Sequence, residues 1–134
     1  MENLVADLSY CKQFVELNIK FDSYFMWVKY KMWKKPKIWI SDMNEMLKVT
    51  CLSGEREYSY PAPTASEIME KLPRVLHDKG KAYYLRIEPE FENNGWACQY
   101  SIITGQTLYF EEKKKLKNAL SLMLCFLIKE KLIN

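Results

Sequence analysis

Two segments with alternating side-chain character, joined through Asn94-Gly95, constrain the fold more than any other feature of this chain. AYYLRIEPEF (residues 82–91) and WACQYSII (residues 96–103) both show the two-residue period of a strand with one buried face. Asn and Gly both tolerate positive φ, so this dipeptide is typical of a tight turn between antiparallel strands. The sequence therefore predicts a β-hairpin. Its core-facing residues are expected to be Tyr83, Leu85, Ile87, Trp96, Cys98, Tyr100 and Ile102.

Further strands are predicted on both sides of this hairpin. From Tyr24 the chain alternates again with apolar residues on both faces, which favours a strand that is central in its sheet or covered on two sides. A turn is predicted at 34–37, because Pro36 has no amide donor, and residues 38–40 begin the return strand. The remaining predicted strands are residues 46–52 and 55–60, around Ser53-Gly54, and residues 107–110, after a turn at 104–106.

Two helices are predicted in the first eighty residues. The first ends near Asn18, and the second begins at a capping box formed by Thr64 and Glu67. Pro73 should kink or interrupt the second helix, and Gly80 should end it. The apolar stripes are Leu4, Leu8, Cys11, Phe14 and Val15 in the first helix, and Ile68, Leu72, Val75 and Leu76 in the second.

A third helix is predicted from about Glu111 to Leu132. Glu111 and Glu112 at its start, and Lys129 and Lys131 near its end, match the helix dipole. Residues 119–128 are apolar nearly all round, so the sheet alone should not cover this helix. We therefore expect a second helix or a second subunit against it, the latter as a homodimer.

These elements predict an α+β fold in a single domain, residues 1–134. The expected architecture is one antiparallel meander sheet with helices packed on it, in the order α-β-β-β-β-α-β-β-β-α. The chain shows no internal repeat or Pro/Gly/Ser-rich linker that would divide it.

Composition limits the classes of partner. The net charge is only +3, with a pI near 8.6, whereas dedicated nucleic-acid modules commonly exceed a pI of about 9. The sequence shows no secretory signal, and its most apolar run, residues 119–128, has about half the roughly 20 residues that cross a bilayer. We therefore expect a cytoplasmic protein without membrane attachment, with Cys11, Cys51, Cys98 and Cys125 as free thiols.

The sequence offers little for catalysis or for a cofactor. Its one histidine, His77, and its unpaired cysteines leave too few ligands for a zinc site. Glu88, Glu90 and Glu92 alternate along one strand, which is typical of a solvated strand face. No phosphate-binding, dinucleotide-binding or hydrolase motif occurs. We expect no enzyme, no metal and no cofactor; an enzyme would need a pocket joining Cys51 or His77 to carboxylates.

One stretch, KYKMWKKPKIW (residues 29–39), has the character of a site. Its lysines could follow phosphates while its aromatic rings stack on bases, as in single-strand binding. Lysines at a hairpin tip also keep edge strands from pairing, which needs no ligand. Tyr30 and Met32 are then expected to face inward. The candidate nucleic-acid-binding residues are Lys29, Lys31, Trp33, Lys34, Lys35, Lys37 and Trp39.

The segment from Tyr58 to Asn134 resembles a loosely defined group of small proteins encoded by bacteriophages, prophages and mobile elements. The likeness lies in YSYPAPTASEIMEKLP, in the strands YYLRI and GWACQY, and in the final KNALSLMLCFLIKEKLI. The resemblance implies a phage-derived protein in a bacterial host cytoplasm, and it implies no activity and no site residues.

Together these features favour a non-enzymatic binding or accessory protein of phage or mobile-element origin. It would act by contact with a host or phage protein. The alternative is a nucleic-acid-binding accessory protein that uses the hairpin at 29–39.

Overall fold

The computed structural model of the chain describes residues 3–40, 56–90, 92, 94–103, 105 and 107–133. Its internal contacts divide it into two compact units, Met1–Glu67 and Ile68–Asn134, and each is described by itself. The described residues contain three helices and two antiparallel sheets, which confirms the α+β class. The expectation of one continuous sheet is wrong. The expectation that the chain forms a single domain stays a prediction.

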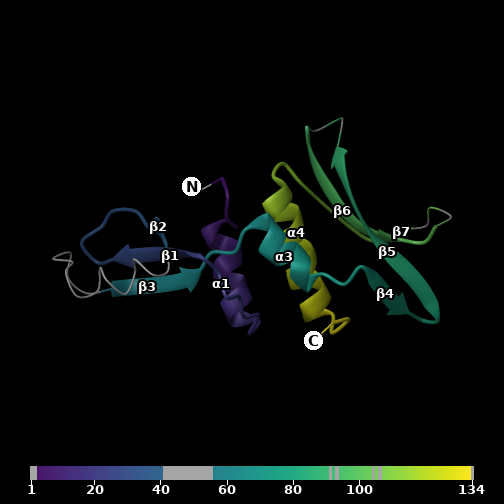
Figure 1. Cartoon of the computed structure of the whole chain (residues 1–134), viewed down its shortest axis with the longest axis horizontal. Helices are drawn as coiled ribbons and strands as arrows, with labels where there is room; N and C mark the ends of the chain where they lie inside the picture. Colours follow the sequence, from purple (N-terminus) through teal and green to yellow (C-terminus); the bar gives the residue numbers. More distant parts are fainter. Residues whose placement is uncertain are drawn as a thin grey trace. The chain divides into compact units, whose positions relative to one another are not determined.

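The first unit is built around a three-stranded antiparallel sheet. Its elements are α1 (Leu8–Glu16), β1 (Phe25–Tyr30), β2 (Lys37–Ile40) and β3 (Arg56–Pro61), and the strand order is β2-β1-β3 (Figure 1). β1 is the central strand, as its two apolar faces predicted, and Trp27, Val28 and Tyr30 are buried. The Trp27 Nε1 donates to the carbonyl of Ala6 at 2.9 Å, which ties the segment before α1 to this sheet.

α1 ends where the sequence predicts but begins later. Asn18 has a φ of 59°, and the amide of Ile19 donates to the carbonyl of Phe14 at 2.8 Å, which closes the helix with a Schellman-type cap. Leu4, expected on the apolar stripe, precedes the helix and is 57% exposed, and Val15 is 50% exposed. Cys11 and Phe14 form the buried face instead.

The boundary between the two sheets follows from prolines. Pro61 ends β3, and Pro63 comes two residues later; neither has an amide hydrogen for a further ladder bond. Thr64 and Glu67 then form the predicted capping box, with the amide of Glu67 donating to the Thr64 Oγ1 at 3.3 Å. They open the short helix α3 (Ala65–Lys71). The strand expected at 46–52 lies outside the described residues.

The second unit is a four-stranded antiparallel meander with one helix on it. Its elements are β4 (Val75–Asp78), β5 (Lys81–Glu90), β6 (Gly95–Ser101), β7 (Thr107–Lys113) and α4 (Leu116–Lys129). α4 packs on β6 and β7, with the rings of Tyr109 and Phe126 4.8 Å apart (Figure 1). The predicted pairing of β5 with β6 is confirmed, with Ile87 opposite Cys98.

The interruption of the middle helix at Pro73 is confirmed, but the prediction that the helix resumes and ends at Gly80 is wrong. The helix ends at Lys71, and Val75–Asp78 form β4, paired with β5. Lys79 and Gly80, with φ of 50° and 78°, make the two-residue turn between these strands. The helical spacing of Val75 and Leu76 was therefore coincidental, because both residues belong to a strand.

Two further turn and boundary predictions are corrected. β6 begins at Gly95, which pairs with Glu90, one residue before the predicted start at Trp96, and Asn94 has the expected positive φ, 55°. Glu111 lies in β7 opposite Cys98, so the acidic pair is not at the start of α4. Pairing with β6 holds this stretch in the sheet, and the first turn of α4 has no acidic residue.

α4 is largely buried within the chain itself. Its buried residues are Lys117, Ala119, Leu120, Ser121, Met123, Leu124, Cys125 and Leu127. The expected homodimer through this helix stays a prediction. Among the described residues, no helix has the length and apolarity that crossing a membrane requires.

Candidate functional site

The lysine-rich stretch forms the end of the β1–β2 hairpin, as the sequence predicts. Val28 pairs with Lys37, and residues 31–36 form the connection. Lys29 pairs with the carboxylate of Glu57 on β3, so its charge is compensated within the sheet. Lys34 and Lys35 are exposed at the tip, together with Lys31. The structure thus brings the candidate lysines together on one hairpin, and the charge of Lys29 is compensated by β3.

The aromatic residues of this hairpin pack against one another. Tyr30, Trp33 and Trp39, here called the aromatic cluster, have ring centroids 5.0, 5.7 and 5.1 Å apart for the pairs 30–33, 30–39 and 33–39. The Nζ of Lys37 lies 4.7 Å from the centroid of the Trp33 ring, a cation–π distance. Such mutual edge and face contacts leave less ring surface for stacking on bases.

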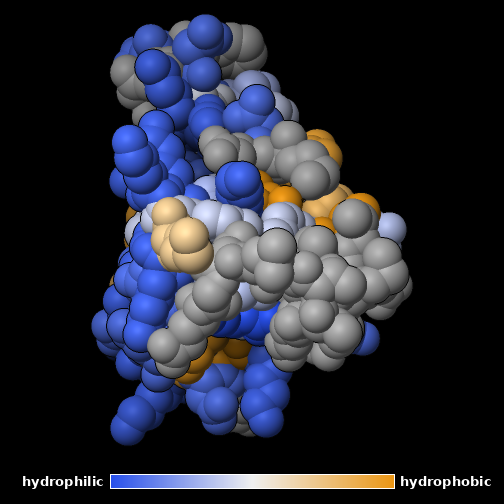
Figure 2. All heavy atoms as spheres, turned by 90° about the vertical axis from the view of Figure 1, so that its left-hand side faces the viewer, coloured by the Kyte–Doolittle hydropathy of each residue, from blue (hydrophilic) through white to orange (hydrophobic). Residues whose placement is uncertain are grey.

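One detail of the predicted alternation is wrong at the hairpin tip. Met32 was expected to face inward with Tyr30, but Met32 is 72% exposed while Tyr30 is 4% exposed. β1 ends at Tyr30, so the two-residue alternation does not extend to Met32. Figure 2 views the molecule from the side of this hairpin. Hydrophilic side chains cover much of its coloured surface, and apolar ones form small separate patches.

The thiols in the described part of the chain are core residues. Cys11, Cys98 and Cys125 are buried, as their apolar neighbours in the sequence predicted. Burial raises the pKa of Cys98 to about 12, with the nearby Glu111 adding to the effect. Burial likewise raises the pKa of Cys125 to about 11, partly offset by Lys129. Neither thiol is poised as a nucleophile, and Cys51 lies outside the described residues.

The other candidates for acid–base chemistry lie on the surface. His77 is exposed on β4 instead of ending a helix. Glu88 forms an ion pair with Arg86, whose Nη2 donates to the Glu88 Oε1 at 2.5 Å, and both side chains are about half exposed. Among the described residues, no group of three or more His, Cys, Asp or Glu side chains could hold a metal ion.

The face of the second sheet opposite α4 is a surface that the sequence reveals only in part. Tyr109 contacts α4, so strand alternation places Phe110 on the other face, and pairing places Gln99 and Arg86 beside it. Tyr84 is 43% exposed and Phe110 48% exposed. We call this surface the open sheet face. It comprises Tyr84, Arg86, Glu88, Ala97, Gln99, Ser101 and Phe110.

The centre of the open sheet face is made of small residues. Ala97 and Ser101 on β6 are 4% and 2% exposed, although no helix of the unit packs over this face in the described contacts. The larger side chains on the neighbouring strands flank them, since Ser101 pairs with Tyr84 and Gln99 pairs with Phe110. The predicted outward direction of Tyr84 and Arg86 is confirmed. Phe110 could have been found from the two-residue period of TLYF.

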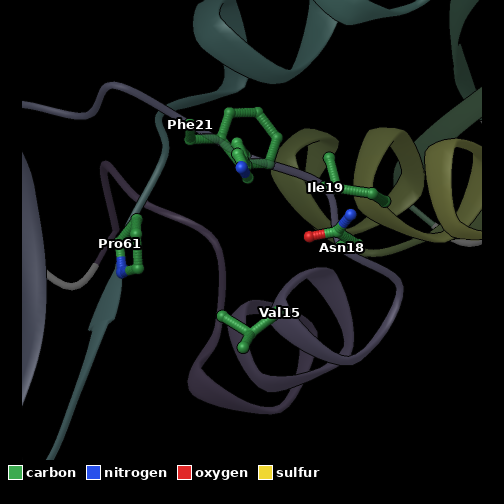
Figure 3. A pocket seen from close by; sticks show the side chains of 6 residues that line it. Val15, Asn18, Ile19, Phe21 and Pro61 are labelled. Carbon is green, nitrogen blue, oxygen red and sulfur yellow. The ribbon is translucent and has the colours of Figure 1, made fainter.

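A pocket of about 360 Å³ lies in the first unit. Figure 3 shows Val15, Ile19, Phe21 and Pro61 placed around a common space, with Asn18 beside Ile19. Lys20 completes the lining. No sequence motif marks this pocket, because its residues come from the end of α1, the following segment and the end of β3.

Comparison of the chain with protein-family models, with curated proteins and with solved structures finds no significant match.

Proposed function

We propose that this chain is a non-enzymatic binding protein that acts through contact with another protein, and that the open sheet face is its contact surface. The supporting observation is the exposure of Tyr84 and Phe110 on a sheet face that lacks a covering helix in its own unit. Exposed aromatic residues together with arginine are the side chains most enriched at protein interfaces.

The charges on this face favour a protein partner over a nucleic acid. Arg86 and Glu88 alternate along β5 and form an ion pair, with their side chains 51% and 45% exposed. The carboxylate of Glu88 beside the guanidinium of Arg86 weakens attraction to phosphates, whereas a protein surface with both signs of charge can pair with both groups. The partner should therefore present apolar surface together with mixed charges.

The resemblance of the segment from Tyr58 to Asn134 to phage and prophage proteins supports a bacterial context. We propose a partner in the host cytoplasm, or a second protein of the same element. A protein of this type would alter the activity of its partner by occupying part of its surface, which needs no catalytic residue.

Binding to the open sheet face is tested with a purified partner. Proteins captured from a host lysate by the tagged chain are purified and titrated against it by isothermal calorimetry. The double variant Tyr84→Ser/Phe110→Ser should weaken the complex by about 30-fold or more, since a central aromatic contact contributes about 2 kcal/mol or more. The matched control is Tyr24→Ser, because Tyr24 is a 58% exposed tyrosine of the first unit. Equal loss in the control, or none in the double variant, would reject this surface.

A nucleic-acid-binding role for the hairpin is the second candidate, supported by Lys31, Lys34 and Lys35 exposed around the aromatic cluster. It predicts affinity for single-stranded DNA or RNA that falls steeply with salt, because bound lysines release counterions. Affinity measured at two salt concentrations for the wild type and for Lys34→Glu/Lys35→Glu/Lys37→Glu distinguishes the two functions. Absence of binding at low salt would remove this candidate and leave the protein-contact proposal unaffected.

A further inference from the structure

The pocket of the first unit has walls that local structure holds in place. Val15 is in the last turn of α1, and Asn18 occupies the left-handed position of the helix cap, with a φ of 59°. The cap bond from the amide of Ile19 to the carbonyl of Phe14, 2.8 Å, fixes the direction of the segment that follows. These contacts fix the positions of Val15, Asn18 and Ile19 before any ligand is present.

The two remaining apolar walls are equally constrained. The ring of Phe21 lies 5.0 Å from that of Phe14, which is 2% exposed and so belongs to the core. Pro61 ends β3 and pairs in register with Met26 of the central strand. A pocket whose walls are preformed loses little conformational entropy on binding.

The chemical character of the lining is asymmetric. Four of its six residues are apolar, and the polar ones are Asn18 and Lys20. Lys20 is exposed, and the lining includes no carboxylate. An apolar hollow whose lining includes one lysine and one asparagine complements a molecule that has an apolar body and one negative group.

We propose that this pocket binds a medium-chain carboxylate, with its hydrocarbon body against Val15, Ile19, Phe21 and Pro61 and its carboxylate beside Lys20. The volume of about 360 Å³ corresponds to about 12 heavy atoms at ~30 Å³ each. Decanoate, with ten carbons and two oxygens, has this size. This site is independent of the open sheet face, and its occupancy is a separate property of the protein.

The proposal is tested by calorimetric titration of the full chain with decanoate. At about 0.3 kcal/mol per heavy atom, a ligand of about 12 heavy atoms should occupy one saturable site with a Kd of about 2 mM. Decylammonium has nearly the same hydrocarbon body with the opposite charge and should bind more weakly. Amide chemical shifts on decanoate addition should change at residues 15–21 and around Pro61.

Two variants separate the apolar contacts from the charge. Val15→Trp should fill the pocket and abolish binding, and it should fold because Val15 is 50% exposed. Lys20→Gln should weaken binding by about 1.4- to five-fold, the range for an exposed ion pair. Lys114→Gln, an exposed lysine of the second unit, is the matched control and should bind as the wild type does.

Three results would overturn the proposal: no saturable binding of decanoate up to about 10 mM, undiminished binding by the folded Val15→Trp variant, or equal affinity for decylammonium. Circular dichroism of each variant before titration establishes that it is folded.

Discussion

Two buried tyrosines differ in a way that a single-atom substitution can measure. Tyr30, in the aromatic cluster, and Tyr100, on β6, are 4% and 0% exposed. The hydroxyl of Tyr100 donates to the carbonyl of Pro73 at 2.7 Å, whereas the buried hydroxyl of Tyr30 has no hydrogen-bond partner among the residues that the structure describes. Replacing each by phenylalanine removes the same atom and keeps both rings.

The expected effects have opposite signs. Tyr100→Phe loses a hydrogen bond and leaves the Pro73 carbonyl without this donor, so it should lower the free energy of unfolding by about 1–2 kcal/mol. Tyr30→Phe removes a hydroxyl that is desolvated without compensation, so it should raise the free energy of unfolding by up to about 1 kcal/mol.

Urea unfolding followed by circular dichroism measures both effects. With a slope of about 2 kcal/mol per molar urea, the midpoint should fall by roughly 0.5–1 M for Tyr100→Phe and should not fall for Tyr30→Phe. If Tyr30→Phe destabilises the protein as much as Tyr100→Phe does, the Tyr30 hydroxyl has a partner in solution and the reasoning fails.

Three further predictions concern the second sheet. Burial raises the pKa of Glu111 above the usual 4.5, so ionisation there opposes folding as pH rises through the folded pKa. Glu111→Gln should therefore gain stability over the wild type at pH 7 but not at pH 4; an equal difference at both would contradict this. Cys98 should be alkylated at pH 8 on the order of 40-fold more slowly in the native than in the unfolded chain. A pKa of about 12 leaves little thiolate in the native chain, and the greater nucleophilicity of a thiolate with a high pKa restores only part of the rate. Peptide mass spectrometry measures the alkylation of Cys98, and comparable rates in the native and unfolded chains would contradict this prediction. Gly95→Ala should lower the free energy of unfolding by about 1–3 kcal/mol, because its Cβ would lie 2.7 Å from the carbonyl oxygen of Lys113. An unchanged urea midpoint would show that the backbone yields there.

Much of the candidate hairpin was predictable because it depends on neighbours in the sequence. The alternation from Tyr24 gave the central strand, and Pro36 marked the turn before β2. The packing of the three rings of the aromatic cluster against one another was not predictable. It arises from the pairing of β1 with β2, which places Trp39 near Tyr30 and Trp33, and the compensation of Lys29 arises from Glu57 on a third strand.

The errors share a physical origin. Val75 and Leu76 fit a helical stripe, yet pairing with Tyr84 and Tyr83 makes them a strand. Glu111 suited a helix start, yet pairing with Cys98 keeps it in β7. Local propensity is weak enough for long-range hydrogen bonding to override it where both conformations are allowed.

The sequence by itself determined the α+β class, the antiparallel hairpins, the end of α1 at Asn18 and the burial of Cys11, Cys98 and Cys125, because periodicity, turn chemistry and apolar surroundings act over a few residues. Only the tertiary structure decided that the strands form two sheets, that α4 covers one face of the second sheet, and that Val15, Lys20 and Pro61 line one pocket. Those features depend on which surfaces meet across long stretches of chain, and no local pattern of residues encodes that pairing.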